Sequence, residues 1–442
     1  MNDLLIHDCT LLDTSSSRVT LIPHQDILIA SQRITRIANS EPLQPDQATE
    51  TIDARGTLAM PGLINTHAHV PMVIFRGLAE DVDLDTWFND YMWPLEQNLQ
   101  PEDVYWGMLL GLVEMIEAGV TTVADHYFFM DRAAQAVEET GVRAALGWAV
   151  FGSQGEEGLN RSAEFVAEFQ GAAKGRITTW MAPHAPYTCS PEFLSACAHT
   201  ASQLNTGIHI HASETRVQTD ASLRKFGKTP IEILRDTGIL DRQTIIAHGC
   251  GITESDIDIL KNHPCGIAHA PKTYLKLAMG IAPVTRLIAE GIPVGLATDG
   301  AVSNNSLDIW ESMRLTALCQ KHESHRPESM SLAETLHLAL NGSARTLAMA
   351  DCIGQLEPGY HADIILIDMN GTHMQPIHNI AANLVYSARA SDVKTVIIDG
   401  RVIMRDRVIL TVDKHEIIRR VNMSMERLAR RFPEKRIQTY RP

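Results

Sequence analysis

Short apolar runs alternate with helical stretches through most of this 442-residue chain, and that alternation restricts the possible folds more than any other feature. Strands that alternate with amphipathic helices form βα units, which build a parallel sheet. Eight such runs follow one another: LINTHAH, TTVADH, VRAALGW, ITTWMAPHAP, GIHIHASE, TIIAHG, CGIAHAP and IPVGLATDG. Eight strands close a (β/α)₈ barrel, although a short apolar run can also be a buried helix segment.

The two ends of the chain have a different pattern. Strand-like runs without helical periodicity fill the first 58 residues, and strand-like runs return late in HADIILID, VIIDGRVI and RVIL. The Asp-Gly pair in VIIDGRVI is a strong hairpin signal. We therefore expect an α/β fold with a TIM-type barrel at 59–355 and a small β-sandwich domain built from 1–58 and 356–442. A basic amphipathic helix is expected in VDKHEIIRRVNMSMERLARRF.

Charge and cysteine content narrow the classes of partner and location. The formal net charge of −15 disfavours nucleic acid and anionic membranes, since both require basic patches. No apolar run reaches the roughly 18 residues of a membrane span, and the first residues lack the pattern of a signal peptide. The seven scattered cysteines, without a CxxC, suit reduced thiols. We expect a cytoplasmic homo-oligomer, a dimer or tetramer, that acts on a small molecule.

Four of the runs end in side chains that can bind a metal. His67 and His69 close the first run, His211 the fifth, His248 the sixth and Asp299 the eighth. In a (β/α)₈ barrel the C-terminal strand ends meet at one face, where active sites lie. Nitrogen and oxygen ligands without a thiolate suit Zn²⁺ first, and also Fe²⁺, Mn²⁺ or Co²⁺. The fourth run has no lysine to bridge a second ion, so we expect one divalent metal per chain.

Other polar residues near strand ends have competing interpretations. Glu214 follows His211 closely and could carry a proton between water and a leaving nitrogen. It could equally be an ordinary acidic residue in the first turn of a helix. His184 could hydrogen-bond a substrate, whereas His126 and His269 are expected to satisfy local backbone groups.

Longer motifs run across nearly the whole chain: MPGLINTHAHVPM, FRGLAED, PHAPYTCS, LKLAMGIAPV, LATDGAVSNNSLDIWESMR and EPGYHADIILID. With the strand-end residues, they resemble the amidohydrolase superfamily and within it the 5-methylthioadenosine/S-adenosylhomocysteine deaminase family. The resemblance implies a metal-dependent barrel that deaminates a nucleoside. It also implies roles for individual residues that spacing alone leaves open.

In similar proteins, residues matching His67, His69 and His211 bind the metal together with the match to Asp299. Glu214 and His248 would flank the attacking water, and Asp299 would receive its proton. The resemblance makes His248 a catalytic hydrogen-bond donor, which revises its first interpretation as a ligand.

The resemblance also implies substrate contacts. Glu96 in WPLEQNL matches a residue that binds ribose hydroxyls, and His184 matches a substrate-contacting histidine. Family members that accept S-adenosylhomocysteine can present two arginines to its carboxylate. Here Trp148 stands at the first of those positions, and Arg161 matches the second only across a short gap.

A further departure follows the seventh run, where Lys272, Thr273 and Tyr274 replace a usual Ser-Asn pair. We expect Tyr274 and Trp148 to change the polarity and shape of the pocket. These departures leave the metal chemistry intact and bear on the choice of substrate.

The function expected first is hydrolytic deamination of an adenine nucleoside, namely 5′-methylthioadenosine, adenosine or S-adenosylhomocysteine, with release of ammonia. The alternative keeps the metal and changes the ring, as in an aminohydrolase or chlorohydrolase of guanine, a pterin, cytosine or an s-triazine. A non-catalytic binding barrel would be expected to lack a ligand or the Glu214–His248 pair. The base-flipping zinc deaminases need HxE and PCxxC motifs, which this chain lacks.

Overall fold

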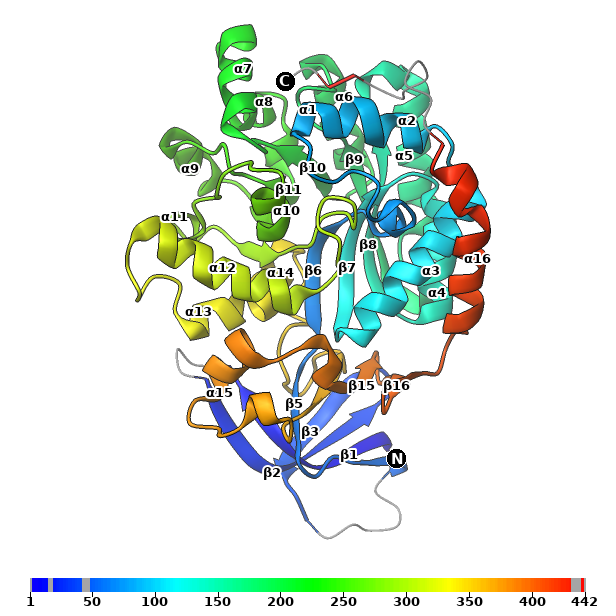
Figure 1. Cartoon of the computed structure of the whole chain (residues 1–442), viewed down its shortest axis with the longest axis vertical. Coiled ribbons are helices and arrows are strands. Elements are labelled where there is room, and N and C mark those ends of the chain that lie inside the picture. The colour runs from blue at the N-terminus through cyan, green and yellow to red at the C-terminus, as the bar shows by residue number, and fades with distance from the viewer. Residues whose placement is uncertain (1, 15–18, 42–47, 431–438, 441–442) are drawn as a thin grey trace.

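The structure is a computed structural model that describes residues 2–14, 19–41, 48–430 and 439–440. One of its two sheets has eight strands that pair in chain order, each parallel to the next, inside a layer of helices (Figure 1). The strands are β6 (Leu63–Ala68), β7 (Val120–Tyr127), β8 (Arg143–Val150), β9 (Ile177–Pro183), β10 (Ile208–Ala212), β11 (Thr244–His248), β12 (Cys265–His269) and β13 (Val294–Leu296). They coincide with the eight apolar runs of the sequence, and the predicted barrel is confirmed.

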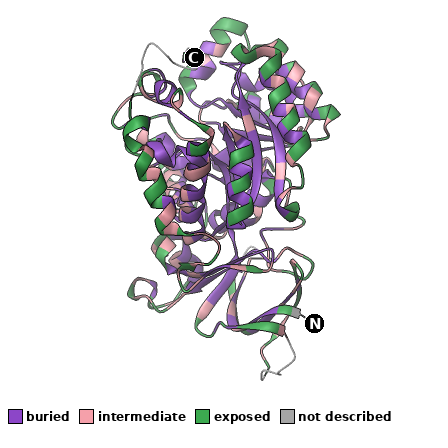
Figure 2. Cartoon of the chain, turned by 90° about the vertical axis from the view of Figure 1, so that its right-hand side faces the viewer, coloured by how far each residue is buried: buried purple, intermediate pink, exposed green. Residues whose placement is uncertain are grey.

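Helices cover the barrel because its strands are apolar on both faces. Every residue of β6, β7, β10 and β11 is buried, and parallel sheets of this kind need helices on their outer face. Figure 2 shows these buried strands behind helices whose outward faces are exposed. The covering helices are α3 (Pro101–Glu117), α4 (Met130–Thr140), α5 (Gly155–Phe169), α6 (Pro191–Gln203), α7 (Arg216–Phe226), α8 (Pro230–Asp236), α9 (Glu254–Leu260), α10 (Pro271–Lys276), α11 (Val284–Ala289), α12 (Ile309–Ser324), α13 (Leu332–His337) and α14 (Ser343–Thr346).

Polar contacts between the first and last strands close the barrel. The Asp299 N–H donates to the His67 carbonyl at 3.0 Å, and the Thr66 hydroxyl donates to the Leu296 carbonyl at 2.9 Å. The Thr66 side chain fills the space beside Gly295, so that an added Cβ would lie 2.4 Å from the Thr66 methyl group. The closure therefore requires glycine at this point of β13.

A short helical segment borders the C-terminal ends of the strands. It consists of α1 (Leu84–Thr86), the π-helix η2 (Trp87–Met92) and α2 (Trp93–Glu96). The Asp83 side chain accepts the Thr86 N–H and so starts the segment. π-Helical turns are rare and occur frequently at functional sites.

The terminal basic helix of the prediction is present as α16 (Lys414–Leu428). It lies against α3, where Arg427 pairs with the buried Asp103 and Arg420 lies over the Trp106 ring (Figure 1). The last residues of the predicted run, Arg431 and Phe432, lie outside the described residues.

The second sheet, which forms the small β domain, has nine strands and draws on both ends of the chain. β5 pairs with β1 on one side and with β14 on the other, so N-terminal and C-terminal strands share one sheet. The strands are β1 (Asn2–Asp13), β2 (Thr20–Ala30), β3 (Arg33–Asn39), β4 (Ala48–Asp53), β5 (Thr57–Pro61), β14 (Ile364–Asp368), β15 (Val393–Ile398), β16 (Arg401–Arg405) and β17 (Val408–Ile409). This confirms the expected small β domain built from both ends of the chain.

The Asp-Gly hairpin is also present. Asp399 and Gly400 join β15 to β16 with φ angles of 53° and 73°, and two positive φ values are what a type I′ turn requires.

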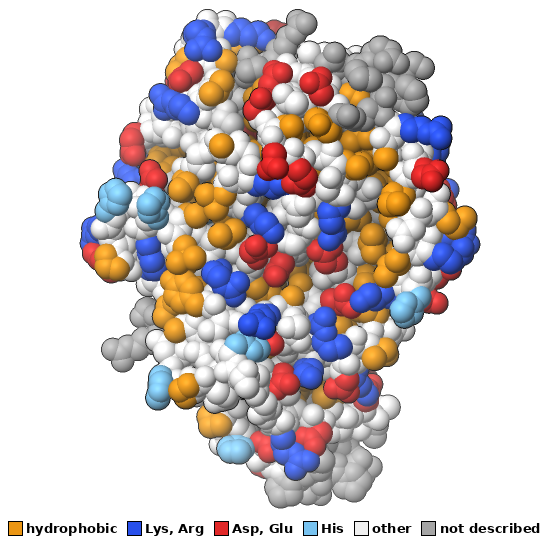
Figure 3. Space-filling model, in the orientation of Figure 1, with side chains coloured by type: hydrophobic (Ala, Val, Ile, Leu, Met, Phe, Trp, Pro, Cys, Tyr) orange, Lys and Arg blue, Asp and Glu red, His pale blue; other side chains and the backbone are white. Residues whose placement is uncertain are grey.

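None of the described helices combines the length and the apolarity needed to cross a membrane. On the face shown in Figure 3, Lys and Arg side chains are interspersed with Asp and Glu rather than gathered in one basic patch.

A buried ion cluster joins the barrel to the small sheet. Arg143, at the start of β8, donates to Asp363 at 2.9 and 3.2 Å and to Asp399 at 2.6 Å. All three side chains are at most 5% exposed. Asp363 precedes β14 and Asp399 forms the hairpin turn, so one guanidinium bonds to two carboxylates of the other sheet.

We expect Arg143→Met to lower the free energy of unfolding by about 3–5 kcal/mol, because it leaves two buried carboxylates without their cation. Urea unfolding followed by circular dichroism measures the change. Arg326→Met is the matched control, since Arg326 pairs with Glu328 in solvent, where such a pair contributes about 1 kcal/mol or less. Equal effects of the two substitutions would contradict a structural role for the buried cluster.

Candidate active site

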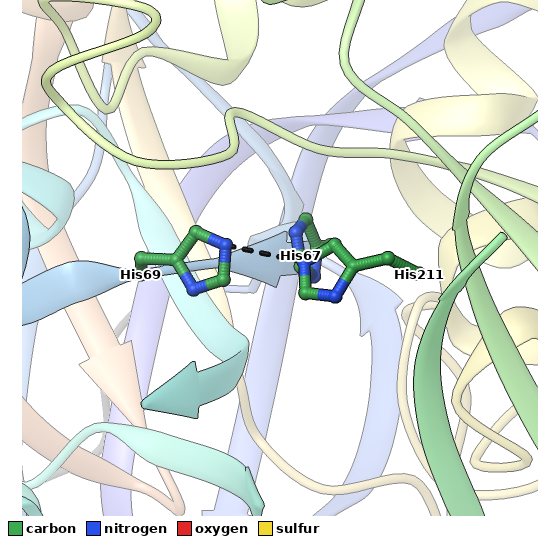
Figure 4. Close-up of side chains that lie close together, drawn as sticks. All are labelled: His67, His69 and His211. Carbon is green, nitrogen blue, oxygen red and sulfur yellow. Dashed lines mark hydrogen bonds between the residues drawn. The ribbon is translucent and has the colours of Figure 1, made fainter. Parts of the chain in front are cut away.

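The C-terminal ends of four barrel strands bring the predicted metal ligands into one cluster. His67 lies on β6 with His69 just beyond it, His211 on β10, His248 at the end of β11, and Asp299 after β13. Figure 4 shows the imidazoles of His67, His69 and His211 close together. Ligand atoms of these three histidines lie within 4.8 Å of one another, as do those of His67, His248 and Asp299. The structure thus brings together all five strand-end residues.

Two of these residues hold a strained backbone. His248 and Asp299 have φ angles of 82° and 62°, in the left-handed region that residues other than glycine seldom adopt. Each such residue costs of the order of 1–3 kcal/mol and persists only where its surroundings fix it. Strain of this kind concentrates at functional sites, and here it occurs at two strand ends that complete the cluster.

Hydrogen bonds fix which ring nitrogen of two histidines faces the cluster. His69 Nδ1 donates to the His126 carbonyl at 2.6 Å, and His211 Nδ1 donates to the His184 carbonyl at 2.8 Å. Both Nε2 atoms therefore carry lone pairs. They lie 3.3 Å apart, joined by the dashed line in Figure 4, yet neither has a proton to give the other. Two lone pairs this close repel each other, and a cation bound between them would remove this repulsion.

The Nδ1 atom of His67 also has a hydrogen-bond partner, which here is the ring of another histidine. Its Nδ1 lies 2.8 Å from Nε2 of His209, and both rings are buried. The Nε2 atom of His67 has no hydrogen-bond partner among the described residues. When His67 donates its Nδ1 proton to His209, the Nε2 lone pair faces the cluster. Burial lowers the pKa of His67 to about 4, which keeps this ring neutral.

Asp299 adds a carboxylate to these nitrogens. Its Oδ1 atom lies 3.5 Å from His67 Nε2 and 3.3 Å from His69 Nε2. Burial alone would raise the pKa of Asp299, but the neighbouring imidazoles hold it well below its usual value. Ligands about 2.0–2.1 Å from a tetrahedral Zn²⁺ are about 3.3–3.4 Å from each other, which matches these spacings. The cluster is a metal site whose donor atoms fit a divalent ion.

Glu214 lies beside the cluster, in the loop after β10. Its side chain is 3% exposed, and Oε1 has no hydrogen-bond partner among the described residues. Burial raises the pKa of Glu214 to about 7, while the Tyr187 hydroxyl opposes this shift. A carboxyl group with a pKa near neutrality can both take up and release a proton. This setting differs from the exposed first turn of a helix that the sequence also allowed.

A cavity opens beside the metal site, and several residues of the site line it. Its walls are largely aromatic, with Trp87, Phe88, Trp93 and Phe151 among them. Its polar lining is formed by His69, Glu96, His126, Tyr127, His184, His211, Glu214, His248, Thr273, Asp299 and Ser303.

Two polar residues of the cavity were predicted to bind substrate. Glu96 lies at the end of α2, where burial raises the pKa of its carboxyl to about 8. His184 accompanies the metal cluster, and its Nδ1 lies 2.9 Å from the Thr188 hydroxyl. Burial lowers the pKa of His184 to about 3, so the ring is neutral.

Trp148 and Arg161 line an adjoining cavity rather than the first one. The two cavities share Glu96, Phe128 and Phe151, so the second continues beyond Glu96. The Arg161 guanidinium lies over the Trp148 ring, 5.4 Å from its centroid. The structure thus brings these two residues together in the cavity that adjoins the first one.

Among Lys272, Thr273 and Tyr274, which depart from the family pattern, only Thr273 lines the cavity. Thr273 lines the cavity and lies 3.1 Å from the Ser303 hydroxyl, while Lys272 forms an ion pair with Glu311. Tyr274 is 1% exposed, and its hydroxyl accepts the Ala270 N–H at 2.7 Å. The expectation that Tyr274 reshapes the pocket is corrected, because its side chain packs behind His248.

One further expectation needs correction. Neither ring nitrogen of His269 has a partner among the described residues, so His269 does not satisfy local backbone groups. His126 lines the cavity, and its carbonyl supports His69.

Sequence reasoning missed His209 and Ser303. His209 and His211 repeat the HxH spacing of β6, a signal that was available. The Ser303 hydroxyl donates to Asp299 Oδ2 at 2.7 Å from a loop, and no spacing pattern marks it.

Comparison with known proteins places the chain among related sequences and structures. Residues 58–403 match the model of the Amidohydrolase family. A 5-methylthioadenosine/S-adenosylhomocysteine deaminase of Desulforudis audaxviator is 46% identical over 390 residues, which is 88% of this chain and 90% of that protein. A zinc-bound adenosine deaminase from Xanthomonas campestris superposes with a TM-score of 0.91 at 28% identity, covering 97% of this chain and 98% of that one.

A more distant structure shares the fold. A zinc-complexed atrazine chlorohydrolase from Arthrobacter aurescens superposes with a TM-score of 0.85 at 24% identity, over 96% of this chain and all of that one (100%). Both of these structural neighbours were crystallised with zinc, as the donor atoms of this site would accept.

We expect His209→Leu to weaken zinc retention by about 10- to 100-fold, because His67 loses the acceptor that orients its ring. Zinc loss to a chelator, followed by absorbance, measures the effect without any turnover assay. His269→Leu is the control: it also removes a fully buried strand-end imidazole, but one without hydrogen-bond partners. If both variants lost zinc alike, His209 would have no specific role in supporting the metal.

Proposed function

The chain belongs to the amidohydrolase family, and from that premise and the geometry of the barrel mouth we propose that it deaminates an adenine nucleoside by hydrolysis. The reaction releases ammonia and leaves the inosine analogue. The chain shares extensive identity with 5-methylthioadenosine/S-adenosylhomocysteine deaminases, and it is a hydrolase that acts on C–N bonds.

One observation carries the proposal: a metal site and a buried carboxyl group of near-neutral pKa face the same aromatic cavity. His67, His69, His211 and Asp299 would hold one divalent ion, which we propose to be Zn²⁺. When bound, the ion supplies Lewis acidity that makes a water molecule nucleophilic near neutral pH.

The residues around the ion would move the protons. Glu214 takes a proton from the attacking water and passes it to a ring nitrogen of the base. It later protonates the departing amine with the second water proton, which Asp299 has taken up during attack and then returned. His248 donates a hydrogen bond to the attacking oxygen, and Asp299 accepts the remaining proton during attack. The buried, neutral state of His248, whose pKa burial lowers to about 3, suits a hydrogen-bond donor rather than an acid.

Substrate recognition would follow the shape of the two cavities. The aromatic walls of the first cavity suit a flat purine, and Glu96 suits the two ribose hydroxyls, because each of its two carboxyl oxygens can form a hydrogen bond. The 5′ substituent of the nucleoside would then extend into the cavity lined by Trp148 and Arg161.

Two further points remain proposals. Seven unpaired cysteines support a cytoplasmic location, since reducing compartments keep thiols free. We also propose that the chain forms a homo-oligomer, a dimer or tetramer, and mass photometry would measure its oligomeric state directly.

An ammonia-release screen tests the proposed function. Zinc-loaded protein is offered adenosine, methylthioadenosine, S-adenosylhomocysteine, guanine, a pterin, cytosine and an s-triazine, and kcat/KM is compared. We expect an adenine nucleoside to be the fastest substrate, because a free base offers no ribose hydroxyls to the Glu96 carboxyl. Faster turnover of guanine, a pterin, cytosine or a triazine than of every adenine nucleoside would overturn the substrate assignment.

We expect Glu214→Gln to retain zinc but to lose about 10²- to 10⁴-fold in kcat, since an amide cannot accept the proton. Glu192→Gln is the matched control, because Glu192 is an exposed acidic residue in the first turn of α6. Near-normal turnover by Glu214→Gln with full zinc content would assign the proton transfer to another residue.

We expect methylthioadenosine to be a better substrate than S-adenosylhomocysteine, and Trp148→Arg to raise the relative kcat/KM for S-adenosylhomocysteine by about tenfold or more. A charge-assisted hydrogen bond to its carboxylate is worth roughly 1.5–3 kcal/mol. Trp148→Leu removes the ring without adding charge and serves as the control. If Leu and Arg shifted the ratio equally, the adjoining cavity would not hold the carboxylate.

A further inference from the structure

Tyr440, near the end of the sequence, packs against residues that border the active site. Its side chain is 6% exposed. The ring stacks on Phe88, with centroids 5.1 Å apart, and meets the edge of Tyr187 at 5.4 Å. Phe88 lines the cavity from η2, and Tyr187 lies beside Glu214. Aromatic pairs in these arrangements add to the stability gained by burial alone.

A chain of hydrogen bonds runs from Tyr440 to the loop that carries Glu214. Gln218 Nε2 donates to the Tyr440 hydroxyl at 3.2 Å, and Gln218 Oε1 accepts the Glu214 N–H at 3.2 Å. Gln218 is 4% exposed, so solvent does not replace either bond. The Thr215 hydroxyl accepts the Gln218 N–H at 3.1 Å and fixes the start of α7. Tyr440 thus determines where the Gln218 amide lies, and that amide holds the backbone of Glu214.

A second connection joins Tyr440 to the opposite wall. The Tyr440 N–H donates to Asn89 Oδ1 at 2.8 Å, and Asn89 Nδ2 donates to the Tyr440 carbonyl at 3.4 Å. Asn89 lies on η2, between Phe88 and Met92, which both line the cavity. The same segment continues into α2 and Glu96. One residue therefore links the wall expected to bind ribose with the loop expected to carry the proton.

We propose that Tyr440 is a positioning residue for Glu214, which it holds in place through Gln218 while it anchors η2 through Asn89. The inference rests on the proposed function for the role of Glu214, whereas the linkage itself is a property of the fold. A purely packing role would need the ring but not the hydroxyl. The hydroxyl is buried and bonds to Gln218, which in turn contacts Glu214. Removing the hydroxyl alone therefore distinguishes a positioning role from a packing role.

Tyr440→Phe is the central test, because it keeps the ring and removes only the atom that holds Gln218. We expect kcat to fall about three- to tenfold, the size of one neutral hydrogen bond, with KM changed by less than about twofold. Tyr440→Ala also frees Phe88, so KM should rise and kcat should fall further. Tyr360→Phe is the control, since its hydroxyl donates to the Ala350 carbonyl near the small sheet. An unchanged kcat in Tyr440→Phe overturns the positioning role.

A double substitution tests the route through Gln218. In a Gln218→Met background, Tyr440→Phe should cause no further loss of kcat, because the link is already broken. Independent, additive losses would overturn the proposed route, even if each single variant were slower.

Hydrogen exchange provides a readout that needs no substrate. In Tyr440→Phe the peptide spanning residues 211–218, which contains the Glu214 N–H, should exchange at least about threefold faster, with zinc content unchanged. Unaltered exchange in this peptide overturns the inference whatever the activity. Faster exchange in a protein that releases ammonia from no compound of the screen would leave the linkage standing and refute the proposed function.

Discussion

Closure between β6 and β13 is the constraint on which the site depends. Asn65 and Thr298, 233 residues apart in the sequence, exchange hydrogen bonds through side chain and backbone, and the Asp299 N–H bonds to the His67 carbonyl. These contacts register the first strand against the last. Because His67 and Asp299 flank that junction, any slip of the register would separate the carboxylate from the imidazoles. The small residue at Gly295 makes the approach feasible.

Burial shifts the pKa values of the titratable groups at the barrel mouth in two opposite directions. It keeps the imidazoles of His67 and His211 neutral, because it lowers the pKa of His67 to about 4 and that of His211 well below its usual value, so that binding a metal requires no proton to leave them. It raises the pKa of Glu214 to about 7, so that a carboxyl can carry a proton at neutral pH. One low-dielectric cavity therefore supplies both ready ligands and a proton carrier. Asp299 escapes this trend because the surrounding rings stabilise its charge.

Much of this arrangement is readable from the sequence, since strand ends in a parallel barrel share one face whatever their separation along the chain. His67, His69, His211, His248 and Asp299 each end an apolar run, and all five meet. Contacts made by ring orientation are not readable in that way.

The positions that sequence reasoning missed or misjudged show why. The partner of His67 Nδ1 is known only once β10 lies beside the cluster, and Tyr274 turns away from the cavity because its hydroxyl finds a backbone N–H. Glu96 looks like any acidic residue on a helix, and only a resemblance to a known family picked it out.

The pairing of β5 with β14 has a consequence for synthesis, because β5 leaves the ribosome some 300 residues before its partner. Until then an apolar strand edge stays open to other chains, a state that favours aggregation and makes the growing polypeptide a natural client of chaperones.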